Sequence, residues 1–411
     1  MSNLTDVVII GAGPYGLSLA AHLRETGLSF RIFGKPLSTW REHMPTGMKL
    51  KSDGFASSLS SPAPGSRLQD YCAQHDIAYQ DRDLPVGLDT FNAYADAFQW
   101  RFVPNVEAKN VSTVEHRRGI FELTLENGEH LLARHVVLAV GITHFANMPD
   151  ELLEIPKDYR THSFHHHDSK RFYHRDVVVL GSGASAVDVA AELIDCEANV
   201  RIVAPESHIR WHNPPGERGA LSWLTRPSSG IGPGWRSYFC AKYPQLFHAL
   251  PQALRLKITR RHLGPAPGWF MRPKVEGKVA TMLDTQLLGA TLRGNKVALI
   301  VSQNGEETAI ACDHVIAATG YKPDLSRLDF FGARLLNEIR HVEKTPVLSP
   351  NFETSVRGLY VVGPAAANSF GPLMRFMVGA EYTSPLLAEH LKQRLKNTSH
   401  VFVEGRAFKP A

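Results

Sequence analysis

One sequence unit occurs twice, and this repeat restricts the fold more than any other feature of the chain. The first copy, DVVIIGAGPYGLSLAAHL, begins at Asp6, and the second, DVVVLGSGASAVDVAAEL, begins at Asp176. Each copy is a β-branched run, then a glycine turn, then a helical pattern. Continuous Val/Ile runs are typical of strands buried on both faces of a parallel sheet, and alanine-rich segments suit helices packed closely on it. The repeat therefore predicts an α/β chain with two doubly wound units.

The glycine turns have the pattern that binds the pyrophosphate of a dinucleotide. Gly11 permits the tight turn, Gly13 lets the backbone approach the pyrophosphate, and Gly16 allows close helix packing. The phosphates then lie at a helix N-terminus, where free N–H groups and the helix dipole favour negative charge. The second unit repeats this pattern at Gly181, Gly183 and Ala186, with Ser182 and Ser185 between them. We therefore predict two Rossmann-like dinucleotide-binding domains.

Three further strand patterns end at a glycine and indicate how the domains are connected. HVVLAVG ends at Gly141 and HVIAATG ends at Gly320, and each is typical of the strand that closes a nucleotide-binding unit. GLYVVG ends at Gly363 and leads into a helical tail, which we expect to return the chain to the first domain. The second domain is therefore predicted as an insertion, residues 146–304, in a discontinuous first domain of residues 1–145 and 305–411.

The stretch from about residue 205 to residue 278 is the least regular part of the chain. It is rich in Pro, Gly and aromatic residues, as in WHNPPGERGALSW and GPAPGW. A segment of this length is longer than a plain connection in a compact domain. We expect a cap on the domain surface; contact of its basic, apolar helix with a membrane surface is the alternative.

The residues that would bind the nucleotide riboses depart from the usual pattern. An acidic residue is expected about twenty positions after the glycine turn. In the first unit that place falls near Gly34 and Lys35, so Lys35 or backbone groups are the candidates to contact the ribose or the adenosine phosphate. In the second unit Ala204 and Pro205 occupy it, and Arg210 is the nearest cation for a 2′-phosphate, although a solvated surface arginine explains it equally well. We expect NADPH at this domain, with NADH possible.

Composition excludes several other classes of function. The chain has 411 residues with 45 Lys plus Arg against 40 Asp plus Glu, spread along the sequence, which argues against nucleic-acid binding. No apolar run reaches the length of a membrane span, and the N-terminus lacks the features of a signal peptide. We therefore expect a cytoplasmic protein without a transmembrane segment.

Metal and dithiol chemistry are not expected either. The four cysteines form no C-x-x-C pair and no metal-ligand spacing. The cluster HSFHHHD, residues 162–168, looks metal-like, but consecutive histidines point in different directions and no ligand partner stands at a recognised spacing. No metal site is predicted.

The chain resembles the flavin-containing monooxygenases and the related amine N-hydroxylases of siderophore pathways, over nearly its whole length. The resemblance rests on GAGPYG, on GSGASA, on the pair His162–Ser163 nineteen residues before Gly181, on ATGY and on ANSFGPLMRF. The chain departs from the family's pattern at three places. IPKDYRTHS lacks the Phe and Gly that precede the histidine, Lys51 and Ser52 replace a flavin-side asparagine, and Gly363 is followed by proline. The resemblance is therefore to a divergent member.

The resemblance implies an FAD enzyme that oxygenates a small organic molecule. NADPH or NADH would reduce FAD, and O2 would then form a C4a-(hydro)peroxyflavin that oxygenates nitrogen or sulfur or attacks a carbonyl in a Baeyer–Villiger-type reaction. Two alternatives remain open at this point. One is a flavin-dependent NAD(P)H reductase or dehydrogenase that passes electrons to another acceptor, and the other is a non-enzymatic flavin-binding redox sensor.

Candidate site residues follow from the motifs and from the resemblance. Ser52, His162 and Arg375 are the catalytic candidates, with a structural role as the alternative for His162 and Arg375. Trp40 is a candidate flavin-lining residue with core packing as its alternative, and cations such as Arg41 and Lys51 would stabilise an anionic reduced flavin. The remaining cofactor-binding candidates are Lys35, Gly141, Arg210, Thr319, Gly320, Gly363, Phe370, Gly371 and Leu373, together with the residues of the two glycine turns.

Overall fold

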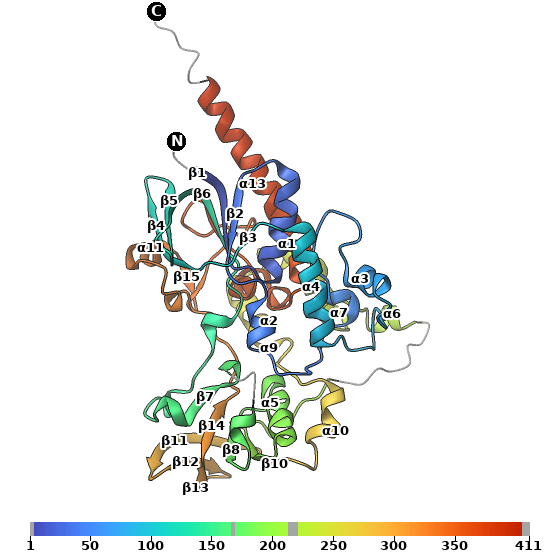
Figure 1. The fold of residues 1–411 in the computed structure, drawn as a ribbon, viewed down its shortest axis with the longest axis vertical. Helices are drawn as coiled ribbons and strands as arrows, with labels where there is room; N and C mark the ends of the chain where they lie inside the picture. The colour runs from blue at the N-terminus through green and yellow to red at the C-terminus, as the bar shows by residue number, and fades with distance from the viewer. Residues whose placement is uncertain (1–3, 166–168, 213–220, 405–411) are drawn as a thin grey trace, which may run out of the picture.

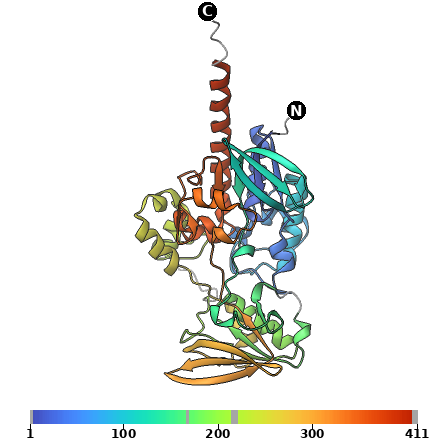
Figure 2. The same ribbon diagram turned by 90° about the vertical axis from the view of Figure 1, so that its left-hand side faces the viewer.

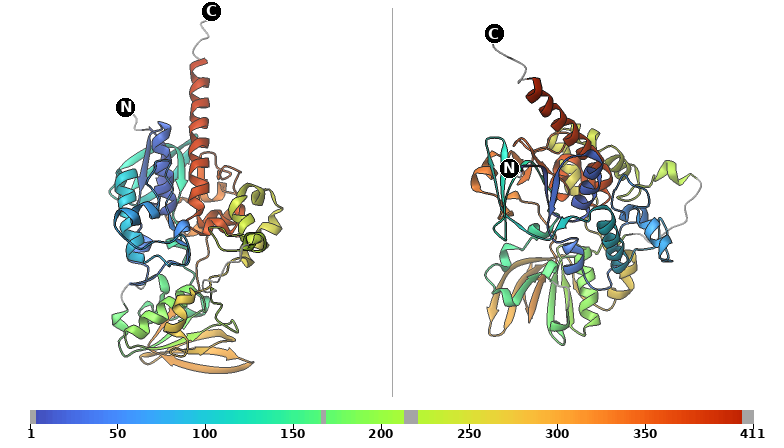
Figure 3. Two further views of the ribbon diagram at one scale, coloured as in Figure 1. Left: turned by 90° about the vertical axis from the view of Figure 1, so that its right-hand side faces the viewer. Right: turned by 45° about the horizontal axis from the view of Figure 1, so that its top comes forward.

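The computed structural model describes residues 4–165, 169–212 and 221–404 of the chain. Two α/β units follow one another along the long axis of the molecule, and helix α13 (Gly379–Glu404) extends beyond the first unit (Figures 1 and 3). No helix within the described residues is long and apolar enough to cross a bilayer. The cytoplasmic location stays a prediction.

The first unit is built on a sheet of strand order β3-β2-β1-β6-β5-β4, with β17 paired to β6. The central strand β1 (Leu4–Ile10) is parallel to both β2 and β6, and its last four residues are buried. Their β-branched side chains fill both faces of the sheet, and α1 (Pro14–Leu23) packs against α13. The other strands are β2 (Phe30–Phe33), β3 (Val106–Glu107), β4 (Val111–Arg117), β5 (Ile120–Leu125), β6 (His130–Leu138) and β17 (Leu359–Val361).

The second unit has a parallel sheet of order β10-β9-β8-β14-β7. Helix α5 (Ala184–Asp195) covers one face, where its apolar residues join a buried cluster with β8 and β9. On the other face, a second buried cluster joins this sheet to the antiparallel sheet β11-β12-β13. The strands are β7 (Arg160–His162), β8 (Asp176–Leu180), β9 (Asn199–Val203), β10 (Ala280–Met282), β11 (Thr285–Arg293), β12 (Lys296–Gln303), β13 (Glu306–Cys312) and β14 (His314–Ala317).

The strand pairing moves one predicted domain boundary. The boundary was predicted between residues 304 and 305, yet β13 pairs with β12, and β14 pairs with β8 and β7. The chain therefore stays in the second unit until Ala317 and returns to the first-unit sheet only at β17, which pairs with β6. Strand β13 completes the antiparallel sheet and β14 the parallel sheet of the second unit. The pattern HVIAATG predicted a strand that closes a nucleotide-binding unit, but the predicted boundary placed this strand in the first domain.

The excursion after β9 packs on the first unit. Ile231, Cys240 and Phe247 are buried in the core of the first unit, together with residues of the C-terminal segment. Figure 2 shows the excursion's helices beside the first unit, away from the second sheet. The last helix of the excursion, α10 (Arg272–Val275), packs against α5 of the second unit. The helices of this segment are α6 (Ser222–Thr225), α7 (Trp235–Lys242), α8 (Pro244–Ala249), α9 (Gln252–Arg261) and α10 (Arg272–Val275).

The remaining elements complete the first unit. Helix α4 (Leu88–Phe102) buries a row of aromatic residues against its core. The other elements of the first unit are α2 (Ser38–Glu42), α3 (Leu68–Gln74), α11 (Ala333–Glu338), β15 (His341–Val342), β16 (Thr345–Pro346) and α12 (Ala367–Phe370).

Candidate functional site

A cavity of about 2010 Å³ lies where the first unit, the second unit and the excursion meet. The first glycine turn lines it from the first unit, and Ser185 and Asp188 line it from α5. The excursion contributes two further stretches, residues 226–233 and 268–270. The sequence-predicted residues that line it are Gly11, Gly13, Lys35, Trp40, Lys51, Ser52, Gly141, Ser185, Gly363 and Arg375.

The first glycine turn opens into this cavity. Gly11 has φ +112°, and a Cβ there would lie 2.3 Å from the Ala139 carbonyl oxygen. A Cβ on Gly16 would lie 1.9 Å from the Gly11 carbonyl oxygen, so close backbone contacts require glycine at both positions. A Cβ on Gly13 would meet nothing within 4 Å, and Gly13 caps α1 without a side-chain hydrogen bond. The first turns of α1 therefore offer unfilled space beside a helix N-terminus, which suits a pyrophosphate.

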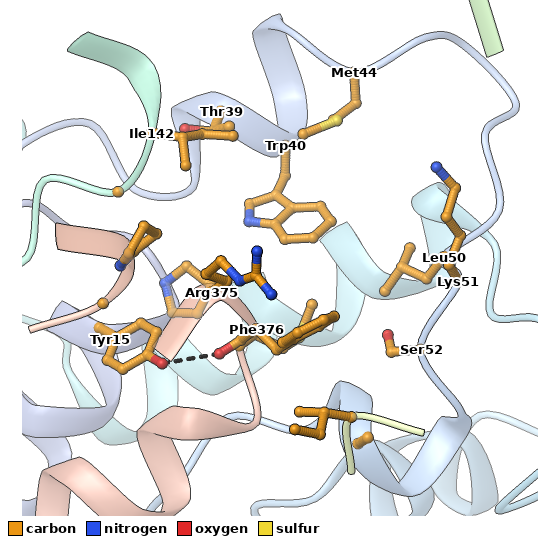
Figure 4. A pocket seen from close by; sticks show the side chains of 18 of the residues that line it. Tyr15, Thr39, Trp40, Met44, Leu50, Lys51, Ser52, Ile142, Arg375 and Phe376 are labelled. Carbon is orange, nitrogen blue, oxygen red and sulfur yellow. Dashed lines mark hydrogen bonds between the residues drawn. The ribbon is translucent and has the colours of Figure 1, made fainter. Parts of the chain in front are cut away.

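Tyr15 connects this turn to the C-terminal segment that holds Arg375 (Figure 4). The Tyr15 hydroxyl lies 2.9 Å from the Phe376 carbonyl oxygen, to which it donates, and 3.2 Å from that of Met374. Burial raises the pKa of Tyr15, so the hydroxyl stays a donor. Arg375 donates through Nη2 to the carbonyl oxygens of His262 and Leu263, which ties the excursion to the same segment. Arg375 also lines the cavity, and burial lowers the pKa of its guanidinium group.

Trp40, Lys35 and Ser52 lie on the cavity wall of the first unit. Trp40 is partly buried and packs against Phe91, with ring centroids 4.8 Å apart. Lys35 is largely exposed and lies 3.5 Å from Glu42. Ser52 shares a hydrogen bond of 2.7 Å with Ser57. All three residues line the cavity, where a flavin could contact them, but each also contacts another residue of the first unit. Their contacts with a flavin therefore stay predictions.

Lys51 makes an ion pair across the two units. Its Nζ lies 3.1 Å from Oδ2 of Asp188, which projects from α5 and is only 7% exposed. Burial raises the pKa of Asp188, and the charge of Lys51 opposes that rise. Lys51 therefore joins the first unit to the second at the cavity wall, whether or not it also contacts a flavin.

The second glycine turn has the same backbone shape but a different environment. Gly181 has φ +117°, and a Cβ there would lie 2.7 Å from the Ala318 carbonyl oxygen, which parallels Gly11. In contrast to Gly13, a Cβ on Gly183 would lie 3.2 Å from Pro265 of the excursion. The backbone N–H of Ala184 donates to the Pro265 carbonyl oxygen at 2.7 Å. The Ala184 N–H, which would donate to a nucleotide phosphate, is therefore already bonded to the Pro265 carbonyl oxygen. Phosphate binding requires the Pro265 segment to move.

Two predicted residues point away from the cavity. Arg41 pairs with Asp96 of α4, because its position in α2 faces that helix. His162 is 1% exposed at the end of β7. Its Nε2 lies 3.0 Å from the Gly320 carbonyl oxygen, and its Nδ1 accepts from the Phe164 N–H. Burial lowers the pKa of His162 to about 4, and both ring nitrogens are engaged. These contacts favour the structural alternative for His162, and its catalytic role stays a prediction.

Other predicted residues serve packing or lie at the surface. Phe370 is fully buried and stacks on Phe352, because the expected flavin-side helix faces the core of the first unit. Gly371 is packed against the ring of Phe247, so a Cβ there would lie 3.1 Å from it. The cavity lining also omits Gly16, Gly181, Ser182, Gly183, Ala186, Arg210, Thr319, Gly320 and Leu373. These residues do not line the cavity, and their predicted contacts with a cofactor stay predictions.

Two acidic residues were missed by the sequence analysis. Asp188 was read as part of a helical pattern, although an aspartate among the alanines of a closely packed helix is a signal for a buried partner. Glu206 follows Ala204 and Pro205 directly, but only Arg210, four positions further along, was named as a candidate for the nucleotide ribose. Residues 166–168 of the histidine cluster lie outside the described residues. Among the described residues, no group of three His, Cys, Asp or Glu side chains is arranged to hold a metal ion.

Comparison with known proteins gives a family match and several relatives. The model of the family described as "Pyridine nucleotide-disulphide oxidoreductase" matches residues 8–218, about half of the chain. An uncharacterized CzcO-like oxidoreductase of Geobacillus kaustophilus is 26% identical over 47% of this chain and 52% of its own, so the chain spans about half the length of that relative. A ferredoxin–NADP reductase of Thermus thermophilus is 25% identical over 76% of this chain and 92% of its own.

A plant relative and a solved structure extend the comparison. A probable indole-3-pyruvate monooxygenase of Arabidopsis thaliana, YUCCA3, is 25% identical over 95% of this chain and 89% of its own. The structure of an ornithine hydroxylase from Pseudomonas aeruginosa covers 95% of this chain and 100% of its own, with 17% identity and a TM-score of 0.75. This likeness confirms the predicted fold class of two dinucleotide-binding domains.

Proposed function

Because the chain belongs to the pyridine nucleotide-disulphide oxidoreductase family, we propose that it is an FAD-dependent monooxygenase that uses NAD(P)H and O2 to oxygenate a small organic molecule. The coarser assignment, a flavin-dependent oxidoreductase that works with a nicotinamide dinucleotide, follows from the family. The finer assignment rests on one observation, the large cavity that the excursion lines together with the first glycine turn.

The first glycine turn fits the FAD pyrophosphate. The space beside Gly13 is open, the N-terminus of α1 has no side-chain cap, and Gly11 and Gly16 are fixed by backbone contacts. When bound, FAD would supply the redox chemistry with O2. The protein would hold it through the N–H groups of α1 and through cavity-lining residues of the first unit.

The excursion suits a substrate chamber. Its residues 226–233 and 268–270 line the cavity, while its helices are anchored in the core of the first unit. Arg375 ties the excursion to the C-terminal segment through the carbonyl oxygens of His262 and Leu263. Oxygenation requires that the access of bulk water to the reacting groups be limited, and a bound substrate held between the excursion and the first unit would serve this. Arg375 offers a cation for an anionic or carbonyl-bearing substrate.

The cysteines argue against thiol–disulfide exchange, the reaction in the family's name. None of the four forms a disulfide within the described residues, and Cys72, Cys240 and Cys312 are buried. Burial raises the pKa of Cys240 to about 11 and that of Cys312 to about 12, so neither is a thiolate at neutral pH. The relative named ferredoxin–NADP reductase keeps electron transfer to an external acceptor as the second candidate function.

An isotope experiment separates the two candidates. The FAD-loaded protein is supplied with NADH or NADPH and ¹⁸O2 and incubated with a panel of primary amines, thioethers and ketones. A monooxygenase places one ¹⁸O atom in an organic product. A reductase instead oxidises the nucleotide faster when ferricyanide, a quinone or ferredoxin is added, and it leaves every panel compound unlabelled; that result would overturn the proposal. No oxidation of either nucleotide would overturn both candidates.

A further inference from the structure

Glu206 lies beside the second glycine turn, at the edge of the second sheet where strands β8 and β9 end. It follows β9 by three residues, and its Oε2 accepts a hydrogen bond of 2.8 Å from the Ser182 hydroxyl. Ser182 is the residue between Gly181 and Gly183. The Glu206 carbonyl oxygen accepts from the Asp284 N–H at 3.0 Å, next to β10. Both the backbone and the side chain of Glu206 are therefore held in place before any ligand binds.

This place has a defined chemical role in doubly wound folds. The nucleotide lies across the carboxyl ends of the strands, and its adenosine ribose lies next to the glycine turn of the unit that binds it. A carboxylate about twenty residues after that turn accepts hydrogen bonds from the ribose hydroxyls. Glu206 stands 25 positions after Gly181, and its contact with Ser182 places the carboxylate at the turn itself.

The charge of Glu206 discriminates between the two nicotinamide nucleotides. NADH presents a 2′-hydroxyl, which can donate to a carboxylate. NADPH presents a 2′-phosphate at the same position, which a carboxylate repels. Arg210, the nearest cation identified from the sequence, is exposed four positions further along the chain and does not line the cavity.

We propose that Glu206 binds the adenosine ribose hydroxyls of NADH and selects against the 2′-phosphate of NADPH. This inference rests on the proposed function in one respect, namely that the second glycine turn binds a nicotinamide nucleotide. Ser182 is a positioning residue, since its hydroxyl orients the carboxylate. Because Glu206 is exposed, solvent screens the repulsion, and we expect a preference of about tenfold for NAD⁺ over NADP⁺.

Calorimetric binding to the FAD-loaded protein tests this without turnover. The probes are NAD⁺, NADP⁺, ADP and adenosine 2′,5′-bisphosphate. The wild-type protein should bind NAD⁺ about tenfold more tightly than NADP⁺, and added salt should narrow this ratio. Glu206→Gln should bring the ratio close to one, and Glu206→Arg should reverse it. Glu307→Gln, which changes an exposed carboxylate of β13, serves as the matched control and should leave the ratio unchanged.

The possible failures have separate meanings. Equal binding of NAD⁺ and NADP⁺ by the wild-type protein, or the same ratio in wild type and Glu206→Gln, would overturn the role of Glu206 and leave the proposed function intact. Absence of binding by both dinucleotides in a protein that retains FAD would overturn the proposed function as well as this inference.

Discussion

Replacement of Lys51 by methionine tests the ion pair that joins the two units. The substitution keeps most of the side-chain volume but leaves the Asp188 carboxylate, 7% exposed, without its partner at 3.1 Å. Removal of one partner of a buried pair costs about 3–5 kcal/mol. Lys51 is 26% exposed and lines the cavity, so water can partly replace it, and we expect a loss of about 2–3 kcal/mol in the free energy of unfolding at neutral pH.

The loss should depend on pH with a definite sign. Burial raises the pKa of Asp188, and removal of Lys51 raises it further. Between the unfolded pKa, about 3.9, and the raised folded pKa, the folded protein binds more protons than the unfolded chain. Stability therefore falls as pH rises through this window. The deficit of Lys51→Met is largest near neutral pH and shrinks as the pH approaches 4.

Chemical denaturation of the FAD-loaded variants at several pH values measures this. Lys35→Met is the matched control, because Lys35 is 63% exposed and its pair with Glu42 is long, so its loss should stay below about 1 kcal/mol. Asp188→Asn should cost less than Lys51→Met, since the remaining lysine can reach water. Equal stabilities of Lys51→Met and Lys35→Met at neutral pH, or a deficit that grows toward pH 4, would refute the reasoning.

Three further outcomes follow from the site. Gly13→Ala should fold but bind less FAD, because its Cβ enters the space for the pyrophosphate, whereas Gly16→Ala should fail to fold; flavin absorbance and circular dichroism distinguish the two effects. His162→Gln should leave the pH profile of turnover unchanged. Burial lowers the pKa of His162 to about 4, so the wild-type protein loses stability as the pH falls from about 6.5 toward 4. The variant should lose less stability over the same pH range. Bound NAD⁺ should displace the Pro265 carbonyl oxygen from the Ala184 N–H, and the movement of that segment should raise hydrogen exchange at the amides that flank Pro265; unchanged exchange with nucleotide bound would show that the segment does not move.

The sequence determined the parts of the protein that depend on local backbone chemistry. The two glycine turns, the buried strands before them and the helices after them follow from residue types at fixed spacing, because only glycine tolerates the backbone angles of Gly11 and Gly181. The repeat of this unit was sufficient to predict two dinucleotide-binding domains. The strand that returns the chain to the first sheet was also visible, since GLYVVG repeats the same buried pattern.

Only the tertiary structure decided which side chains meet. Lys51 and Asp188 are 137 residues apart, and no spacing rule connects them. His162 and Arg41 belong to motifs of suitable composition, yet their partners, Gly320 and Asp96, come from distant segments and turn them away from the cavity. The environments of Gly13 and Gly183 differ for the same reason. The turns are alike in sequence, but Pro265 arrives at one of them through long-range packing, which local residue patterns do not encode.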